Sequence, residues 1–494
     1  MRGLQCLLLL ILSLVKGVGA YGQPDSSKVR NKFHYSFEIG SFFSLNNKIP
    51  FWQKANQFGA VPQSGNSLYF RQMIESKTDT SAGFFHADYC LDLATVVGEK
   101  PMIIIPEAFL KLNFGPFVIS GGRFKEVLGL VDSTLSSGSI TWSGNSLGIP
   151  QVRIAIPEYT KLFVPWLGFK GHYSHGWFGD QVSVKDYYLH QKALYGRIGS
   201  DKSRLRVYGG LLHHVQWGGE PKYGPSGPGD DRFTDGAFAE DWFTYGQVVF
   251  PFRALREDTT GYGDFELMNR FGNHIGQIDI GGDINLGSMN LLVYKQNIFE
   301  TGQTFSSLTN LDDGLYGVAL KSRREGAVFK RLVLEYLRTT NQGSYRSGLP
   351  RLLGLPDRYF GTETYYFNHM QYIDGWAYES ETIGTPFLVP QEEIRPEKQS
   401  YPDAVFYNNN RIIAAYAGLN VRLNSIDLTS RVSYSRNYGA LFTPIPPVDQ
   451  MSMAVQAAIP LKNKNAFLKV NIGIDQGDLI NDNYGAQIAY QRFW

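Results

Sequence analysis

Three glycine-rich segments decide how this chain folds: SGSITWSGNSLGIPQVRIAIPEYT (137–160), WLGFKGHYSHGWFGD (166–180) and RLRVYGGLLHHVQWGGE (204–220). In these segments, residues that read as strands give way to Gly, Ser and Asn, which is typical of strands that end in loops. Trp142, Trp177 and Trp217 stand at these transitions. Aromatic rings in polar, glycine-rich surroundings are what a sugar-binding surface requires.

A period of two in hydrophobicity recurs along the rest of the chain. Between residues 277 and 286, isoleucines at 278, 280 and 284 alternate with Gln277, Asp279 and Asp283. Similar patterns cover residues 204–216, 426–434 and 468–475. One apolar and one hydrated face, repeated in this way, predicts an all-β protein, either a soluble sandwich or a membrane barrel. Beyond residue 20, no segment has the run of roughly 18 apolar residues that a membrane-spanning helix needs.

Composition agrees with many strands and tight turns. The chain has 494 residues, which exceeds the roughly 300 at which a single soluble core stops growing, whereas a closed membrane barrel is free of that limit. Aromatic residues make up 14% of the chain, and there are 53 glycines. A net charge of +2 with 19% charged residues gives no indication of nucleic-acid binding.

The N-terminus predicts secretion. Arg2, an apolar run over 4–15 and the small residues Val18-Gly19-Ala20 are typical of a signal peptide over 1–20. A polar, mobile segment is expected over 21–32. Removal of the signal leaves Cys90 as the single cysteine, so no intramolecular disulfide can form. Proline near the start and glycine near the end of 49–63 predict a short helix that plugs a lumen or caps a rim.

Metal binding and catalysis are not expected. His172, His175 and Asp180 lie close in sequence, but no paired Cys/His spacing accompanies them, and the adjacent His213 and His214 should point to opposite faces of a strand. No G-x-S-x-G motif and no glycine-rich loop that opens a helix is present. Carboxylates that could supply a glycosidase pair are Asp132, Glu158, Asp180, Asp186, Glu240, Asp241 and Asp374. We therefore predict no cofactor, no metal and no enzymatic activity.

Aromatic residues among Gly, Ser and Asn give the better functional signal. Flat rings suit pyranose faces, and neighbouring amides and acids supply directional hydrogen bonds. The alternative is that Trp and Tyr anchor a barrel at the lipid interface. Tyr365, Asn368 and Gln216 share the pattern. The glycan-binding candidates are Trp142, Asn145, Tyr173, His175, Trp177, Asp180, Trp217, Tyr366 and Trp376.

Six strings resemble the capsule assembly Wzi family in the form found in Bacteroidetes. They are PFWQKANQFG (50–59), SSGSITWSGNSLGIPQVRIAIPEYT (136–160), GHYSHGWFGD (171–180), LHQKALYGRIG (189–199), LRVYGGLLHHVQWGG (205–219) and GWAYESETIGTPF (375–387). The resemblance runs from about Tyr35 to the C-terminus. It implies an outer-membrane barrel of about 18 strands, with helical elements near its periplasmic side, that holds capsular polysaccharide as a lectin.

With that resemblance in view, about 18 antiparallel strands can be placed over residues 33–494. Short turns are expected on one side of the barrel, for example at SDKS (200–203) and at Asn424-Ser425. Long outer loops are expected near 125–150, 174–191, 217–274 and 340–410. The final strand ends in Phe493-Trp494, which resembles the signature read by the barrel-assembly machinery. A soluble secreted sandwich is the alternative fold.

The predicted function is attachment or organisation of capsule at the cell surface by an outer-membrane lectin. Its expected partners are capsular or surface polysaccharide, outer-membrane lipid and, during biogenesis, the barrel-assembly machinery. The alternative is an outer-membrane porin or sugar channel, because a barrel of this size can leave an aqueous pore.

Overall fold

The computed structural model describes residues 31–78, 84–224, 236–251, 262, 265–266, 269–399, 406–462 and 465–494. The signal peptide predicted over 1–20 lies outside the described residues, as does nearly all of the segment 21–32. None of the helices within the described ranges is long and apolar enough to cross a membrane.

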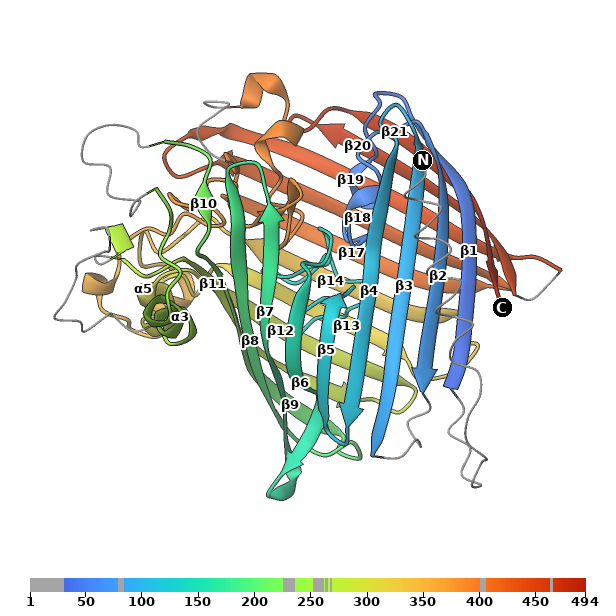
Figure 1. Ribbon diagram of the computed structural model, residues 1–494, viewed down its shortest axis with the longest axis horizontal. Coiled ribbons are helices and arrows are strands. Elements are labelled where there is room, and N and C mark those ends of the chain that lie inside the picture. The colour runs from blue at the N-terminus through green and yellow to red at the C-terminus, as the bar shows by residue number, and fades with distance from the viewer. Residues whose placement is uncertain are drawn as a thin grey trace.

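Eighteen antiparallel strands form one closed wall (Figure 1), which confirms the predicted barrel. The first strand, β1 (Asn31–Ser44), pairs with β2 (Ser67–Thr78) on one side and with the last strand, β21 (Asn483–Phe493), on the other. The sheet therefore has no free edge, which removes the row of unpaired backbone groups that an open edge exposes.

The other fifteen wall strands follow one another around the barrel in chain order between β2 and β21, and the additional two-residue strand β10 (Glu220–Pro221) pairs with β8. The fifteen are β3 (Phe85–Gly98), β4 (Met102–Phe114), β5 (Phe117–Arg123), β6 (Gln151–Leu162), β7 (Val164–Asp180), β8 (Val184–Ile198), β9 (Leu205–Trp217), β11 (Asn273–Asn285), β12 (Met289–Phe299), β13 (Gly314–Ser322), β14 (Phe329–Arg338), β17 (Ile412–Leu423), β18 (Ile426–Gly439), β19 (Pro444–Pro460) and β20 (Ala466–Gly477).

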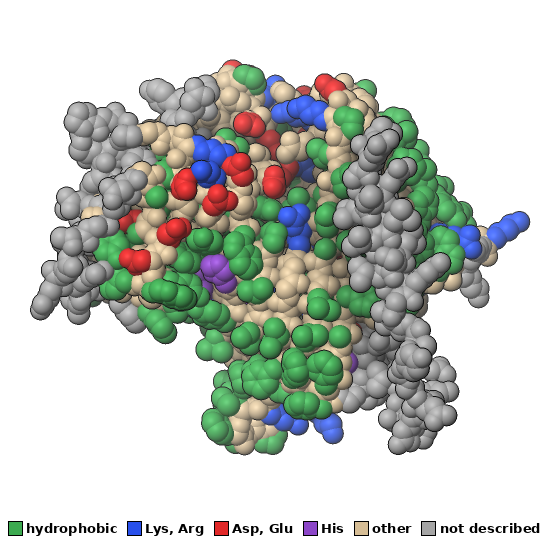
Figure 2. Space-filling view, viewed as in Figure 1, with side chains coloured by type: hydrophobic (Ala, Val, Ile, Leu, Met, Phe, Trp, Pro, Cys, Tyr) green, Lys and Arg blue, Asp and Glu red, His purple; other side chains and the backbone are tan. Residues whose placement is uncertain are grey.

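Alternation along each strand gives the wall an apolar outside and a polar inside. On β11, Ile280 is 60% exposed on the outer surface, whereas the neighbouring Asp279 is buried in the lumen. Hydrophobic side chains cover the lower part of the wall seen in Figure 2, and acidic side chains gather above them. This arrangement is that of a transmembrane barrel, whose outer surface meets lipid.

The two ends of the barrel differ. At one end the strands are joined by short turns, such as the single residue Phe163 between β6 and β7 and the pair Asn424-Ser425 between β17 and β18. Asn424 adopts φ of +55°, as a two-residue hairpin requires. The long connections emerge at the opposite end. Because short turns of outer-membrane barrels face the periplasm, the end that carries the long connections is named the outer end.

The helices lie in connections at the outer end. They are α2 (Phe51–Lys54), α3 (Trp242–Val249), α5 (Gly302–Ser306) and α6 (Gly348–Leu352), accompanied by the 3-10 turns η1 (Asp357–Tyr359), η2 (Gln391–Glu393) and η3 (Pro396–Lys398) and the small hairpin of β15 (Ala377–Tyr378) and β16 (Glu381–Thr382). Helical elements on the periplasmic side, implied by the resemblance, are not seen in the described residues. Each helix follows a strand that runs toward the outer end, so the helices lie at that end of the barrel.

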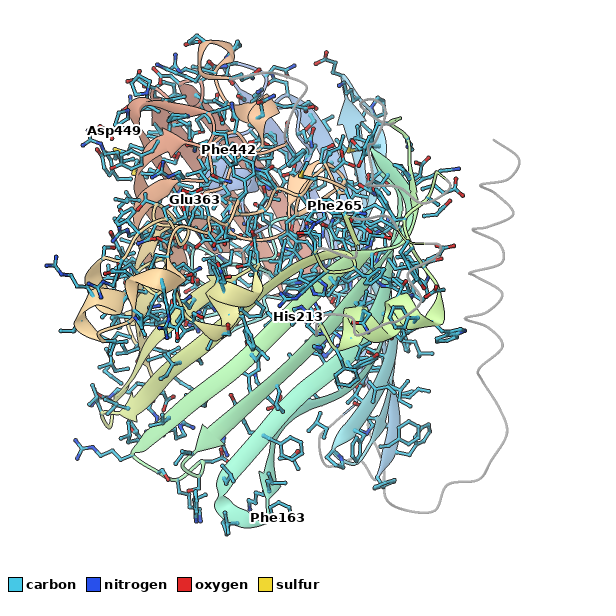
Figure 3. The ribbon with its side chains drawn as sticks, turned by 90° about the vertical axis from the view of Figure 1, so that its left-hand side faces the viewer. Phe163, His213, Phe265, Glu363, Phe442 and Asp449 are labelled. Carbon is cyan, nitrogen blue, oxygen red and sulfur yellow. The ribbon has the colours of Figure 1, made fainter. Side chains whose placement is uncertain are left out.

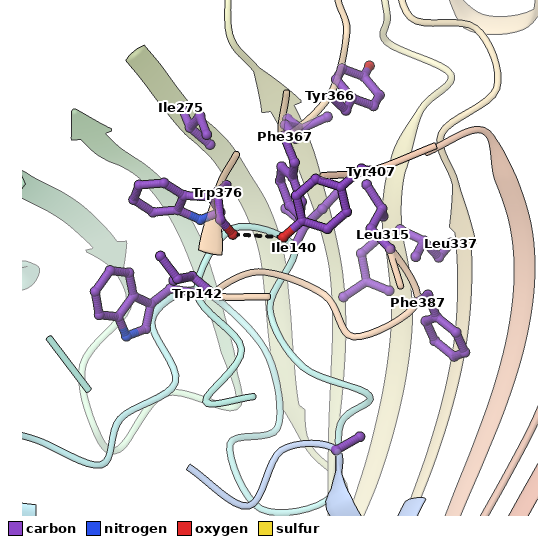
Figure 4. Packing of buried hydrophobic residues seen from close by; sticks show 14 of the residues in the cluster. Ile140, Trp142, Ile275, Leu315, Leu337, Tyr366, Phe367, Trp376, Phe387 and Tyr407 are labelled. Carbon is purple, nitrogen blue, oxygen red and sulfur yellow. Dashed lines mark hydrogen bonds between the residues drawn. The ribbon is translucent and has the colours of Figure 1, made fainter. Parts of the chain in front are cut away.

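Three connections fold back into the lumen and pack together as a plug. Their described parts are residues 45–66, 124–150, 339–399 and 406–411. Trp52 of α2 is buried and donates its Nε1 hydrogen to Ser433 Oγ on the wall (2.9 Å). In Figure 4, Trp376 and Tyr407 meet beside Ile140, with the Tyr407 hydroxyl donating to the Trp376 carbonyl at 3.0 Å. The helix expected over 49–63 thus takes the plug position, shortened to a single turn.

Polar side chains of the inner wall hold the plug. Glu335 on β14 accepts hydrogen bonds from Ser137 N (2.7 Å) and Ser136 Oγ (2.6 Å). Gln277 on β11 accepts from Thr141 N at 3.1 Å. These bonds satisfy backbone groups that would otherwise be buried without partners. Residues 125–150, predicted to be an outer loop, are therefore mostly an internal segment, because the wall supplies the polar contacts that water gives an exposed loop.

Residues 174–191 were also predicted to be a long loop, and this was wrong. They belong to β7 and β8, which are joined by only 181–183. The plug covers these strands from inside, and α3 covers them from outside, where Tyr173 and Tyr245 hydroxyls lie 2.7 Å apart (Figure 1). With both faces covered, the apolar and polar alternation that identifies a strand is lost.

Replacement of Glu335 by Gln should loosen the plug segment 136–145. Hydrogen bonds to a charged group contribute roughly 1.5–3 kcal/mol, so amide hydrogen exchange across this segment should accelerate by at least about tenfold. Glu325→Gln, in the exposed turn between β13 and β14, is the matched control and should leave exchange unchanged. Equal protection of the segment in wild type and Glu335→Gln would refute the anchoring role.

Candidate functional site

Four of the predicted sugar-binding residues lie inside the plug. Trp142, Asn145, Tyr366 and Trp376 are all buried, with Trp376 fully so. Trp142 stacks on the wall residue His214, with ring centroids 5.2 Å apart. Trp376 donates its Nε1 hydrogen to the Thr141 carbonyl at 2.7 Å and so joins two plug segments. These rings hold the plug together and present no face to a polymer outside the barrel.

Four more of the predicted residues lie on the outer surface of the wall. Tyr173, His175 and Trp177 project from β7, and Trp217 projects from the end of β9. His175 packs edge-on against Trp177, with ring centroids 5.0 Å apart, and Trp217 packs against Tyr245 of α3 at 5.2 Å. This cluster matches the aromatic girdle that was the alternative interpretation of these residues.

The remaining predicted residue, Asp180, ends β7 and forms an exposed ion pair with Lys222. His213 and His214 do point to opposite faces. His213 Nε2 lies 3.0 Å from His274 Nδ1 on the outside, and His214 Nδ1 lies 3.0 Å from Gln191 Nε2 on the inside. In the described part of the chain, no three His, Cys, Asp or Glu side chains converge as metal ligands would. The predicted set therefore occupies three separate places.

A cleft at the outer end is the best-formed candidate site. It has a volume of about 800 Å³, which is ample for several sugar rings, and four connections contribute to it. Figure 3 shows Phe265, Glu363 and Phe442 around it, at the end of the barrel opposite Phe163. We call it the outer cleft. Its principal lining residues are Phe265, Asn269, Arg270, Glu300, Gly302, Glu363, Tyr365, Asn368, His369 and Phe442.

Aromatic rings form one wall of the outer cleft. Phe442, in the turn between β18 and β19, is 75% exposed and packs against Tyr365 with ring centroids 5.4 Å apart. The next residue, Tyr366, points the other way and donates its hydroxyl hydrogen to Asp313 at 3.0 Å. That anchor fixes the backbone from which Tyr365 reaches the cleft, so the neighbour of the predicted residue is the one that a ligand can touch.

Hydrogen-bond donors form the opposite side. His369 Nδ1 accepts from the backbone N–H groups of Gln371 (3.2 Å) and Tyr372 (3.4 Å), so the ring carries its hydrogen on Nε2. Burial lowers the pKa of His369 to about 4, which keeps the ring neutral at pH 7. Arg270 lies beside it in the lining, half-buried, and forms an ion pair with no carboxylate of the described residues.

Glu300 lies deeper, at the point where β12 leaves the wall. Its carboxyl accepts a hydrogen bond from Phe367 N at 2.8 Å. Burial raises the pKa of Glu300 to about 8, so the group is mostly protonated at neutral pH. The carboxyl therefore contributes little negative charge to the cleft and ties the connection after β12 to the plug.

The sequence identified part of this site. Tyr365 and Asn368 share the aromatic and amide pattern, and both line the outer cleft. The sequence did not indicate Arg270, His369 or Phe442, because each belongs to a different connection and no regular spacing links them. A positively charged residue within an aromatic-rich connection, as in MNRFGNH (268–274), was the one available signal.

No family model and no curated protein sequence matches this chain. Among solved structures, Wzi from Escherichia coli, described as a carbohydrate-binding barrel involved in group 1 capsule assembly, aligns with 92% of this chain and 83% of its own, with a TM-score of 0.54 and 13% identity. OccK2 from Pseudomonas aeruginosa aligns with 93% of this chain and 97% of its own, with a TM-score of 0.46 and 8% identity. The likeness to Wzi establishes the fold, and the protein is an outer-membrane barrel.

The Glu300 carboxyl should make the outer cleft sensitive to pH. Its pKa is about 8 in the folded protein and near 4.5 when unfolded, so the folded state binds more protons between these values. Stability contributed by Glu300 therefore falls as the pH rises from about 5 to 8. Exchange of the Phe367 amide, corrected for its intrinsic rate, should accelerate over that range.

Glu300→Gln keeps a hydrogen-bond acceptor without a titratable charge. In this variant the corrected exchange rate of the Phe367 amide should stay constant from pH 5 to 8. A wild-type rate that is equally constant would show that the Glu300 carboxyl does not control this contact.

Proposed function

We propose that the protein is a nonenzymatic outer-membrane lectin of the capsule assembly Wzi type, which binds capsular polysaccharide and holds it at the cell surface. The observation that carries the proposal is the outer cleft, where the exposed ring of Phe442, the half-buried ring of Tyr365 and the Arg270 guanidinium line one cavity at the outer mouth of a filled barrel. Aromatic faces beside a few directed polar groups are the ordinary composition of a sugar site.

Two further observations support the assignment to capsule. The strings at 136–160, 205–219 and 375–387 resemble the Wzi family, and all three contribute to the plug or to the wall that holds it. The solved structure of Wzi, described as a carbohydrate-binding barrel, shares the fold over most of both chains. Because a polymer offers many repeats, weak contacts at single clefts can add up to firm retention.

The filled lumen argues against a porin. Trp52, Ile140 and Trp376 belong to one continuous buried cluster that reaches wall residues such as Ile275 and Leu315. The close-packed side chains of this cluster obstruct the lumen at that level of the barrel. We propose accordingly that polysaccharide is held at the mouth of the barrel and is not transported through it.

The C-terminus supports assembly by the machinery that inserts outer-membrane barrels. Trp494 packs on Tyr35 with ring centroids 5.1 Å apart, and its backbone N–H donates to the Tyr35 carbonyl at 2.9 Å. We propose that this aromatic end is recognised before β1 closes the barrel against β21 and is then covered by the closure.

Phe442→Ala should weaken binding of purified capsular polysaccharide by about two- to tenfold, the range expected for loss of one aromatic contact. Phe442 is exposed, so the variant should fold normally. Phe163→Ala, an exposed phenylalanine at the periplasmic end, is the matched control and should bind like wild type. Titration of detergent-purified protein against the polymer provides the measurement, and an unaffected Phe442→Ala variant would argue against the outer cleft.

In planar lipid bilayers the protein should give no stable unit conductance, because the plug fills the lumen. A general porin measured in the same salt solution serves as the positive control. Regular, long-lived conductance steps from the wild-type protein would favour a porin or sugar channel over the lectin.

A further inference from the structure

We propose that the outer cleft selects acidic sugars, with the Arg270 guanidinium binding the carboxylate of a uronic acid residue in the polymer. This inference rests on the proposed lectin function and adds the chemical class of the ligand. It follows from the placement of a half-buried guanidinium, without an ion-pair partner among the described residues, in a cleft lined by aromatic rings.

The position of Arg270 is built into the backbone around it. A Cβ added to Gly302 would lie 2.5 Å from Arg270 Nη2, so the guanidinium lies against the backbone at Gly302. Gly302 is the first residue of α5, and the N-cap residue Thr301 accepts a hydrogen bond from Thr304 N. A side chain at position 302 would compete with the guanidinium for this space.

The polar groups nearest to Arg270 leave its donors free. His274 uses Nδ1 for His213 and Nε2 for the Phe271 carbonyl. No hydrogen bond from the Arg270 guanidinium to another described residue is present. The guanidinium, which carries five N–H donors, therefore lies in the lining of the cleft without a hydrogen-bond partner in the described part of the chain, and His369 lines the same cleft.

Negative charge in the outer cleft does not neutralise Arg270. Glu300 is mostly protonated at neutral pH because burial raises its pKa to about 8. Glu363 is exposed, and Figure 3 shows it apart from Phe265. Glu266, four residues before Arg270, is buried and accepts hydrogen bonds from Ala239 N and Gln371 Nε2. None of these three carboxyls forms an ion pair with Arg270.

A ligand carboxylate fits this environment better than a neutral sugar does. Taking a guanidinium partly out of water is costly unless a partner replaces the lost hydration. Planar carboxylate and guanidinium groups can form two parallel hydrogen bonds, which are stronger than those of a hydroxyl. The rings of Tyr365 and Phe442 would meanwhile contact the apolar face of the same or the next sugar.

The test compares one polymer in two forms. The ligand is capsular polysaccharide purified from the organism that encodes the chain, either native or after carbodiimide activation and borohydride reduction of its carboxylates to alcohols. Full-length wild-type protein in detergent should bind the native polymer at least about tenfold more tightly than the reduced one, as expected for loss of a charged hydrogen bond.

Variants assign the effect to Arg270. Arg270→Gln should bind native polymer as weakly as wild type binds the reduced polymer, and reduction should weaken it no further. Arg351→Gln, an exposed arginine on α6, is the matched control and should behave like wild type. Heat-modifiable migration on gels verifies that every variant is a folded barrel.

The outcomes separate this inference from the proposed function. Equal wild-type affinity for native and reduced polymer would overturn the selection of acidic sugars while leaving the lectin intact. Discrimination that survives in Arg270→Gln would overturn the role of Arg270. Absence of binding to either polymer would overturn the lectin itself, and the present inference with it.

Discussion

The lumen of an 18-stranded barrel is too wide for its own wall side chains to fill, and the rest of this structure follows from that constraint. Three connections enter the lumen and pack around Trp52, Ile140 and Trp376. Their backbone polar groups find partners on the inner wall, for example at Glu335 and Gln277. The alternating side chains of each strand thus face lipid on the outside of the barrel and polar plug segments on the inside.

Filling the lumen also creates the candidate site. Once the plug occupies the barrel, the remaining parts of the connections close over its mouth and leave the outer cleft between them. Tyr366 and Glu300 illustrate the coupling, because both are tied into the plug while their neighbours line the cleft. The lining of the cleft is thereby joined to the plug, an arrangement that suits the proposed retention of a polymer at the cell surface.

The wall could be predicted from sequence because period-two alternation survives wherever one face meets lipid and the other meets polar groups, as in β11 and β18. The alternation did not identify the outer halves of β7 and β8 as strands, because the plug and α3 cover both of their faces. The internal position of 136–145 was not predicted, because Gly, Ser and Asn in this segment have the composition of an exposed loop, and only the wall partners show that they are buried. Arg270, Phe442 and Tyr365 belong to three different connections, which only the topology of the barrel brings to one cleft. No local sequence pattern could therefore group them.

Deletion of the gene tests the proposed attachment of capsule by this barrel, because capsule can then be located either on the cells or in the medium. Capsular polysaccharide would be quantified separately in washed cells and in culture supernatant, with the total unchanged as evidence that synthesis and export continue. A large fraction of the capsule should move from the cells to the supernatant and should return to the cells when the wild-type gene is restored. Capsule that remains fully attached to the deletion strain would contradict it.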